Sequence, residues 1–325
     1  MSTMSTAPRK NLILIAGRSH PELAEEVAKH LRAPLTPQSV YDFANGEIFV
    51  RFEESVRGSD AFVIQSHCAP INKWVMEHLI MVDALKRASA ERITVIMPFY
   101  PYARQDKKHR GREPVSARLI ADLFKTAGAD RIMTVDLHTA QIQGFFDGPM
   151  DHLFAQHLLA AHVKSRYGDL PLTVVSPDSG RAKLAEKWAD QLGGRPVAFI
   201  HKTRDPLRPN EVVANRVVGE VAGRTCVVID DMIDTGGTIV KAVGQLLEAG
   251  AADVIVAATH GVLSDRAAQR LADSGVRELI LTNTLPIPDE HRFPRMTVLS
   301  IAPLLARAIR EVFEDGSVTS LFENG

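Results

Sequence analysis

The sequence predicts an α/β fold made of two similar domains, each with a central parallel sheet. Short apolar runs rich in β-branched residues alternate with segments of helical periodicity along the chain, a pattern typical of parallel sheets covered by helices. The two halves also share an order of elements, because residues 58–97 and residues 223–258 each predict strand, loop, helix and strand. A length of 325 residues is enough for two domains of ordinary size.

The first half contains the elements of one such domain. Apolar runs predict strands at residues 11–16, 61–65, 92–97 and 131–135, and helical periodicity predicts helices at residues 21–31, 73–88 and 114–127. Between the first helix and the second strand, the pair Asn45-Gly46 precedes an alternating segment that ends at Phe52. An Asn-Gly pair before such a segment predicts a β-hairpin.

The second half repeats the alternation. Strands are predicted at residues 172–175, 197–200, 226–229, 254–258, 278–281 and 297–301, and helices after residue 180, from 234 to about 248, after 258 and up to about 313. We expect the domain boundary near residues 149–154. The expected domains are residues 10–152 and residues 153–311, with residues 312–325 returning to the first.

Composition excludes several classes of protein. The chain has 38 Lys and Arg against 39 Asp and Glu, so no overall charge attracts it to nucleic acid or to an anionic membrane. The N-terminus is polar and no apolar run approaches the length of a membrane span. Cys68 and Cys226 lie in or just after predicted strands, which favours buried thiols over a disulfide framework. A cytoplasmic protein is expected.

Residues 225–238, TCVVIDDMIDTGGT, contain the strongest functional signal. Asp230 and Asp231 follow a predicted strand, at the sheet edge where α/β proteins bind ligands. The next segment opens a helix with two glycines and two threonines, which suits a phosphate, and the acidic pair can accept hydrogen bonds from a polyol. A sugar phosphate would use both. The alternative is that Asp234 is an ordinary helix N-cap beside a tight turn and a solvated strand end.

Five cations lie in the segment between the strand at 92–97 and the helix at 114–127: Arg104, Lys107, Lys108, Arg110 and Arg112. A run of charge is most often a solvated surface. This one directly follows a strand end, where loops commonly carry function. A mobile basic loop at that place could close over a polyphosphate.

The segment VVIDDMIDTGGT resembles the phosphoribosyl-diphosphate (PRPP) loop of type I phosphoribosyltransferases and of ribose-phosphate diphosphokinases, the PRPP synthetases. The segments FANGEIFV, PYARQDKK, DLHTAQIQGFFD, SPDSG and HKTR resemble further motifs of the second family, in the same order along almost the whole chain. The sequence is therefore identified as a member of that family. The resemblance implies two duplicated type I phosphoribosyltransferase-like domains.

The resemblance also implies an activity: transfer of the diphosphoryl group of ATP to the 1-hydroxyl of ribose 5-phosphate, giving PRPP and AMP. The implied ATP contacts are Phe43, Asn45, Glu47, Arg104 and Gln105. The implied ribose 5-phosphate contacts are Arg204, Asp230, Asp231, Asp234, Thr235, Gly236, Gly237 and Thr238. Lys202 and Arg204 are implied as catalytic, and His138 and Asp178 as Mg²⁺ ligands, with Asp136 and Asp147 as further candidates.

The resemblance implies a homo-oligomer, often a hexamer, activated by phosphate and inhibited by ADP. Ser55, Arg57, Arg112 and Ser317 match regulatory positions of the family. His138 has an alternative role as a structural histidine, because Mg²⁺ prefers oxygen ligands. Inactive family members that act as regulatory subunits, and transcription regulators that sense PRPP, remain as other classes. The matching residues at 104, 138, 202 and 204 argue against the first, and the lack of a basic extension against the second.

One residue departs from the family pattern at a motif. The family usually has a second glycine where this chain has Arg181, directly after Gly180. A close approach of the backbone to a ligand at that position is therefore in doubt. His109 and the loop at residues 205–209 are also unusual, and the sequence assigns them no role.

Overall fold

The computed structural model describes residues 10–177, 181–204 and 212–323 of the chain. The side chains of residues 202–204, 212–215 and 323 are outside this description too. The chain divides into two compact units. Unit 1 comprises residues 1–153 and 301–325, and unit 2 comprises residues 154–300. The segment that returns to unit 1 thus begins at Ile301 and not at residue 312 as expected, and it includes the whole helix at residues 302–313.

Unit 1 is built on a five-stranded parallel sheet. Its order across the sheet is β1 (Leu12–Ala16), β4 (Asp60–Ile64), β5 (Arg92–Met97), β6 (Arg131–Val135) and β7 (Met150–Leu153). A separate antiparallel hairpin is formed by β2 (Gln38–Asp42) and β3 (Ile48–Phe52). The helices are α1 (Pro21–Leu31), α2 (Ile71–Arg87), α3 (Ser116–Ala127), the 3₁₀ helix η1 (Ala140–Phe145), α8 (Ala302–Phe313) and α9 (Ser320–Glu323).

Unit 2 is built on a seven-stranded sheet. Its order is β10 (Val212–Val218), β9 (Val197–Arg204), β8 (Leu172–Ser176), β11 (Thr225–Ile233), β12 (Asp253–Gly261), β13 (Glu278–Thr282) and β14 (Met296–Leu299). All neighbours are parallel except β10, which pairs antiparallel with β9. The helices are α4 (Gln156–Tyr167), α5 (Ala182–Gln191), α6 (Gly237–Glu248), α7 (Ala267–Asp273) and the 3₁₀ helix η3 (Asp289–His291).

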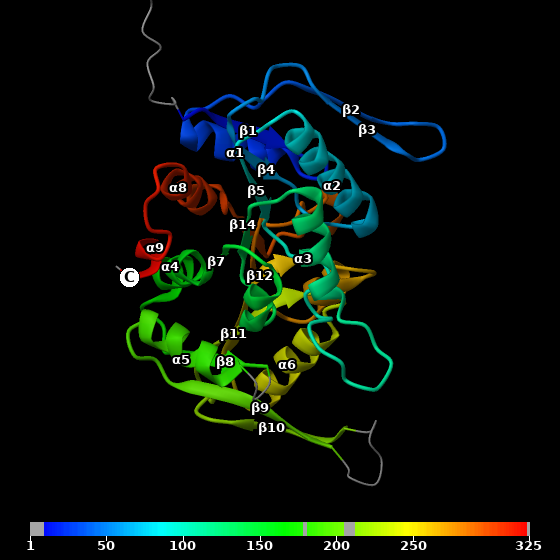
Figure 1. Cartoon of the computed structure of the whole chain (residues 1–325). Helices are drawn as coiled ribbons and strands as arrows, with labels where there is room; N and C mark the ends of the chain where they lie inside the picture. The colour runs from blue at the N-terminus through cyan, green and yellow to red at the C-terminus, as the bar shows by residue number, and fades with distance from the viewer. Residues whose placement is uncertain (1–9, 178–180, 205–211, 324–325) are drawn as a thin grey trace, which may run out of the picture. The chain divides into compact units, whose positions relative to one another are not determined.

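The two units have the same topology. In each, five parallel strands follow one another across the sheet in chain order, and an antiparallel ribbon lies between the first and second of them in sequence (Figure 1). The helix that follows the last strand of each repeat belongs to the other unit, because α4 follows β7 but is in unit 2, and α8 follows β14 but is in unit 1. Each repeat therefore contributes its last helix to the unit formed mainly by the other repeat.

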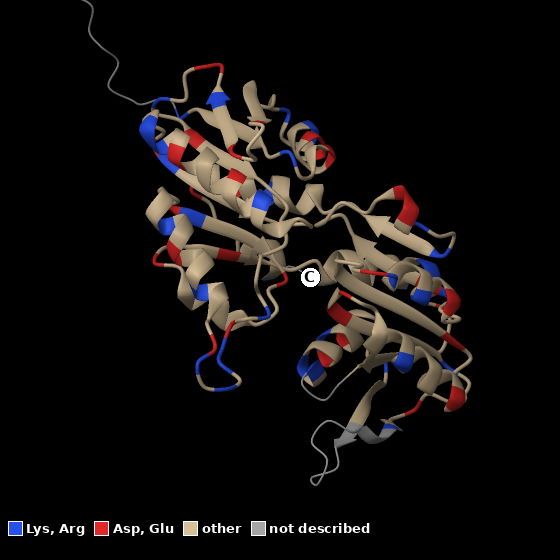
Figure 2. Ribbon diagram, turned by 90° about the vertical axis from the view of Figure 1, so that its right-hand side faces the viewer, with Lys and Arg blue, Asp and Glu red and all other residues tan. Residues whose placement is uncertain are grey.

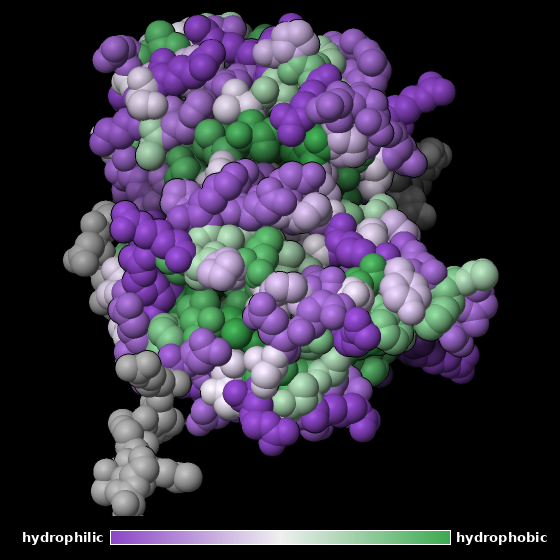
Figure 3. All heavy atoms as spheres, turned by 90° about the horizontal axis from the view of Figure 1, so that it is seen from above, coloured by the Kyte–Doolittle hydropathy of each residue, from purple (hydrophilic) through white to green (hydrophobic). Residues whose placement is uncertain are grey.

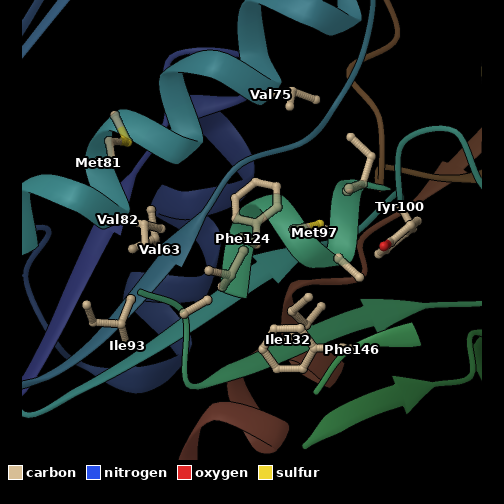
Figure 4. Packing of buried hydrophobic residues seen from close by; sticks show 14 of the residues in the cluster. Val63, Val75, Met81, Val82, Ile93, Met97, Tyr100, Phe124, Ile132 and Phe146 are labelled. Atoms are coloured by element: carbon tan, nitrogen blue, oxygen red, sulfur yellow. The ribbon is translucent and has the colours of Figure 1, made fainter. Parts of the chain in front are cut away.

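Each unit has its own hydrophobic core. In unit 1, buried side chains from the sheet, α2 and α3 form one cluster, and Figure 4 shows Phe124 of α3 near its middle. In unit 2, a second cluster joins the sheet to α6 and α7. Both cysteines are free, with Cys226 buried and Cys68 half-buried. These thiols behave as small core side chains, as the sequence predicts.

The surface is mixed in character. In Figure 2, Lys and Arg residues are interspersed with Asp and Glu residues along the ribbon of both units. Figure 3 shows hydrophilic side chains over much of the face seen from above, with apolar side chains gathered between them. No helix of the described residues is long and apolar enough to cross a membrane.

The structure confirms the α/β class and most predicted elements, and it corrects several others. The strand predicted at residues 226–229 continues to Ile233, because β12 pairs with it up to Gly261. Asp230 and Asp231 are thus strand residues and do not follow the strand. Six elements of the described residues were not predicted: β7, α4, β10, α9 and the 3₁₀ helices η1 and η3. β7 and α9 have only four residues each, and such short segments carry little periodicity.

The exchange of helices predicts that a substitution near the C-terminus destabilises unit 1. Leu305 of α8 is fully buried, so Leu305→Ala should cost about 2–5 kcal/mol. Trp74 is in unit 1 and Trp188 is in unit 2, so variants that retain one tryptophan report on one unit. In urea unfolding monitored by fluorescence, the Trp74 transition should shift to lower urea.

The matched control is Leu247→Ala, because Leu247 of α6 is 39% exposed and lies in unit 2, so its loss should leave the Trp74 transition unchanged. A shift confined to the Trp188 transition would contradict the assignment of α8 to unit 1.

Candidate functional site

The turn between β11 and α6 has the features of an anion site. Gly236 is the N-cap of α6, with φ +74° and no side-chain hydrogen bond that caps the helix. Asp234 is therefore not the N-cap residue, so the alternative role of this carboxylate as an ordinary helix cap is wrong. The positive φ favours glycine at this position. The N–H groups of the first turn are left for a ligand, and the helix dipole favours an anion there.

The surroundings of the turn fix its backbone and leave its hydroxyl groups accessible. Arg270 of α7 donates a hydrogen bond from Nη1 to the Thr235 carbonyl oxygen at 2.9 Å. Thr235 and Thr238 are exposed, and Gly236 is buried. A phosphate placed at this turn would meet backbone N–H groups together with threonine hydroxyls. Sequence reasoning missed Arg270, because nothing in the sequence shows that α7 reaches back to residue 235.

Asp230 and Asp231 are buried at the end of β11, and one cation contacts both. The side chains are 15% and 6% exposed, respectively. Arg181 Nε lies 3.1 Å from Asp230 Oδ1, and Arg181 Nη2 lies 2.6 Å from Asp231 Oδ1. The backbone N–H of Asp231 also donates to Asp230 Oδ1 at 2.9 Å. The acidic pair is thus held by a residue to which the sequence assigns no role.

Burial is the main influence on the Asp230 carboxyl. Burial raises the pKa of Asp230, Arg181 lowers it and the neighbouring Asp231 carboxyl raises it, and together they give a pKa of about 7. Asp230 therefore titrates near neutral pH. A carboxyl poised in this way changes between hydrogen-bond donor and pure acceptor over a narrow range of pH.

Lys202 and Arg204 both lie in β9, which continues from the predicted strand at residues 197–200 to Arg204. Asn215 of β10 is opposite Lys202 in the ladder, and Val212 is opposite Arg204. The side chains of both cations are outside the described residues, as is the whole of Asp178. The structure does not test their predicted roles.

The hairpin of unit 1 presents the predicted ATP contacts at its tip. The Glu47 N–H donates to Asn45 Oδ1 at 3.1 Å, and the Phe43 N–H donates to the Glu47 carbonyl oxygen at 2.7 Å. Phe43 and Tyr41 are 46% and 47% exposed, and their rings pack edge to face with centroids 5.4 Å apart. Half-exposed aromatic rings can stack on a base.

Ion pairs join the turn end of this hairpin to the rest of unit 1. Asp42, the last residue of β2 before the turn, accepts from Arg18 Nη2 at 2.6 Å and from Lys73 Nζ at 2.7 Å. These two hydrogen bonds, with that from Lys73 the larger, lower the pKa of Asp42. The hairpin is therefore held next to its turn, where Phe43 stays half-exposed.

The basic loop is anchored at one end and exposed along its tip. Asp106 is buried and accepts at Oδ2 from Thr139 Oγ1 and from Gln141 Nε2, both at 2.8 Å. Ser116 Oγ donates to Gln105 Oε1 at 2.7 Å. Beyond these anchors five cations are exposed: Arg104, Lys107, Lys108, Arg110 and Arg112. Asp106, which sequence reasoning missed, ties the loop to the DLHTAQIQ motif.

The predicted Mg²⁺ ligands fall in different units. His138 is half-buried in unit 1, between β6 and η1, and Asp178 belongs to unit 2. Asp136 is half-buried and has φ +38°, and Asp147 is exposed. Among the described residues, no three His, Cys, Asp or Glu side chains gather in a group that could hold a metal. Mg²⁺ commonly takes one or two carboxylates and completes its shell with waters and substrate phosphates, so the donors named here suit it better than a metal that needs a full protein shell.

Comparisons with known proteins place the chain among enzymes that make PRPP, in agreement with the family resemblance of its motifs. Residues 12–128 match the family model described as the N-terminal domain of ribose phosphate pyrophosphokinase, and residues 197–323 match the phosphoribosyl synthetase-associated domain. The chain is 71% identical over 323 residues to a ribose-phosphate pyrophosphokinase of Mycobacterium tuberculosis, covering 99% of both chains. It is 64% identical to the protein of that name from Streptomyces coelicolor, again over 99% of both.

A solved structure is similar over most of the chain. The crystal structure of phosphoribosylpyrophosphate synthetase from Mycobacterium smegmatis matches with a TM-score of 0.90 and 69% identity, covering 94% of this chain and 100% of that one. Family models match both the first and the second half of the chain, and a relative is 71% identical over 99% of its length. The chain belongs to the ribose-phosphate pyrophosphokinase family.

Proposed function

We propose that the chain carries out the reaction of its family with unit 2 as the acceptor site and unit 1 as the source of the ATP contacts. The reaction transfers the diphosphoryl group of ATP to the 1-hydroxyl of ribose 5-phosphate and gives PRPP and AMP. The observation that carries the proposal is the glycine-opened, uncapped turn beside the buried acidic pair. This arrangement suits a ligand that is a phosphate at one end and a polyol at the other.

In the acceptor site, the turn from Asp234 to Thr238 binds the 5-phosphate through backbone N–H groups and hydroxyls. Asp230 and Asp231 accept hydrogen bonds from the ribose hydroxyls. The phosphate is thereby fixed at one end of the sugar and the 1-hydroxyl is presented at the other. Holding a nucleophile in this way converts an encounter between two substrates into a step within one complex.

In the donor site, the aromatic side chain of Phe43 packs on the adenine, and Asn45 and Glu47 contact its polar edge. Arg104 and Gln105 contact the phosphates, and the exposed cations of the basic loop close over them. The 1-hydroxyl oxygen forms a bond to the β-phosphorus and the bond from that phosphorus to the α-phosphate oxygen breaks. AMP leaves with the electron pair, and the hydroxyl proton passes to solvent.

Lys202 and Arg204 stabilise the negative charge that develops on the transferred group. Phosphoryl transfer needs positioning and charge neutralisation more than a nucleophilic side chain. The assignment rests on the place of the two residues in the chain, two apart within β9. We assign Lys202 to the transition state and Arg204 to both the transition state and the acceptor substrate.

Asp178 and His138 would hold Mg²⁺. When bound, the metal ion neutralises phosphate charge and orients the oxygens of the triphosphate. Asp178 supplies the hard oxygen donor that Mg²⁺ prefers, and His138 acts directly or through a water.

We also propose a homo-oligomer, a hexamer as in the family, in the cytoplasm. Leu119 and Leu123 of α3 are 56% and 39% exposed, and Met76 of α2 is 52% exposed. Residues four apart share one face of a helix, so α3 presents adjacent apolar side chains that a neighbouring subunit can cover.

Phosphate and ADP are proposed as effectors. Ser317 lines a cavity of about 570 Å³ in unit 1 together with Arg92 and Arg131. Those arginines form ion pairs with Asp60 and Asp151, so an anionic effector must compete with carboxylates already in place. The other matching positions are Ser55, Arg57 and Arg112.

The nucleotide product tests the reaction. With ATP, ribose 5-phosphate and Mg²⁺, the protein should release AMP in an amount equal to PRPP, and chelation of Mg²⁺ should stop both. A kinase that attacks the γ-phosphorus would release ADP, and a phosphoribosyltransferase would ignore ATP. Separation of the products by ion-exchange chromatography decides between them. Release of ADP, or no turnover of ATP, defeats the proposal.

Two substitutions separate catalysis from binding. Lys202→Ala should lower kcat by about 10²-fold or more with a smaller change in KM, because it removes a group that stabilises the transition state. Thr235→Val should mainly raise the KM for ribose 5-phosphate, by about tenfold, through loss of a hydroxyl from the phosphate turn. Steady-state kinetics with each substrate varied measures both. The reverse pattern would contradict the assignment, and Lys183→Ala, on an exposed lysine of α5, serves as the control.

The basic loop should become protected on binding nucleotide. Its tip from Lys107 to Arg112 is exposed, so trypsin should cut after Lys107, Lys108 or Arg110. Mg-ATP should slow this cleavage by about tenfold or more if the cations close over the phosphates. Mass spectrometry of the fragments identifies the bonds cut. Equal cleavage with and without Mg-ATP would indicate a solvated surface loop.

A further inference from the structure

Arg181 is a partly buried cation to which the sequence assigns no role and which the structure places beside the acidic pair. It is the N-cap residue of α5. Its side chain is only 20% exposed and reaches across to β11, where it contacts both members of the acidic pair. The Arg181 side chain therefore contacts both carboxylates of the proposed acceptor site directly.

Two buried carboxylates side by side need a counter-charge. Burial and mutual repulsion both disfavour the ionised pair, and breaking a buried ion pair leaves an uncompensated charge. Among the described neighbours, β12 places Ala258 opposite Asp230, and His260 opposite Met232. His260 is buried and its Nδ1 lies 2.9 Å from Thr284 Oγ1. The charged groups that act on the Asp230 carboxyl are Arg181 and Asp231.

The guanidinium also fixes the direction of the two carboxylates. A planar fork binds two acceptors in a set geometry, and here Nε and Nη2 take one oxygen from each aspartate, Oδ1 in both cases. These contacts orient the planes of both carboxylates through one shared guanidinium. Two carboxylates aligned by a common partner are suited to a pair of hydroxyls on neighbouring carbons.

We propose that Arg181 is a positioning residue of the ribose 5-phosphate site, which holds the Asp230 and Asp231 carboxylates side by side for recognition of the sugar hydroxyls. The proposal rests on the proposed function of that site. It assigns specificity for the hydroxylated sugar to a residue outside the acidic pair and the phosphate turn.

The test compares two ligands that differ by one hydroxyl. Binding of ribose 5-phosphate and of 2-deoxyribose 5-phosphate is measured by calorimetry for the wild type, Arg181→Gln and Arg181→Lys. Arg181→Gln should weaken ribose 5-phosphate by about tenfold or more, as for loss of a charged hydrogen bond, and 2-deoxyribose 5-phosphate by much less. Arg181→Lys should recover part of the loss, because it restores the charge without the fork. Lys183→Gln, an equal loss of charge on the same helix at an exposed residue, should bind as the wild type does.

A second readout is the dependence on pH. Without Arg181, the pKa of Asp230 rises above its value of about 7, so Asp230 is protonated at pH 7 and ionised again at high pH. The loss caused by Arg181→Gln should therefore be larger at pH 7 than at pH 9. The comparison with the wild type at each pH cancels titration of the 5-phosphate, which both proteins bind. In kinetics, the KM for ribose 5-phosphate should rise while the KM for ATP is unchanged.

The outcomes that overturn the inference are distinct from failure of the proposed function. Three results with Arg181→Gln would each reject a positioning role: unchanged binding of ribose 5-phosphate, an equal loss of affinity for both sugars, or tighter binding. Tighter binding would indicate that Arg181 competes with the sugar for the carboxylates. If Arg181→Gln does not fold, the same comparison of the two sugars with Arg181→Lys decides. Failure of the wild type to form AMP would instead reject the proposed function.

Discussion

The constraint on which the acceptor site depends is the burial of two adjacent carboxylates at the end of β11. Strand pairing with β12 carries Asp230 and Asp231 into the sheet, where ionised groups are costly without a partner. Arg181 supplies that partner from the start of α5. The glycine at the start of α6 then places positive backbone charge a few residues further along the chain. The site is therefore a series of fixed charges of alternating sign, and this order suits a sugar with a phosphate at one end.

The position in the first repeat that corresponds to Asp230 carries a neutral side chain, Gln65. Gln65 follows the strand AFVI as Asp230 follows CVVI, but it is a neutral amide that hydrogen-bonds within unit 1. It accepts from Ser19 Oγ at 2.6 Å and donates to Glu77 Oε1 at 2.9 Å, and the buried Glu77 also receives two hydrogen bonds from Arg18. These hydrogen bonds join Ser19, Gln65 and Glu77 to one another and to Arg18. In unit 2 the corresponding strand carries the acidic pair and the following helix begins at Gly236, whereas α2 begins after Pro70, so two copies of one topology present different chemistry at the same place.

The sequence predicts the class, the repeat and most elements because these depend on local periodicity. The bounds of α1, β5 and β6 agree with their predicted ranges, since each is a strongly patterned segment with a proline, glycine or charged residue near its ends. The end of β11 could not be predicted, because aspartates are unfavourable in strands, and pairing with β12 and the contact with Arg181 that stabilise them there are not local in the sequence. Likewise the sequence marks Arg181 as unusual, yet nothing in a linear chain shows that residue 181 lies within 3.1 Å of residue 230.

The described parts of the two substrate sites differ in how firmly they are held, and this difference bears on mechanism. The acceptor turn is braced through Thr235 by Arg270, and the acidic pair by Arg181, so its geometry is set before the sugar binds and little ordering cost remains. In unit 1 Gln105 and Asp106 are anchored by side chains, and Glu113 accepts from the N–H groups of His109 and Arg110, while the cations of the loop are exposed. In the proposed function, ordering that loop over a triphosphate would consume part of the ATP binding energy, and the gain would be exclusion of water from the reacting phosphorus. A rigid acceptor site and a closing donor loop would together favour transfer to the sugar over hydrolysis, because the hydroxyl would already be in place when the loop excludes water.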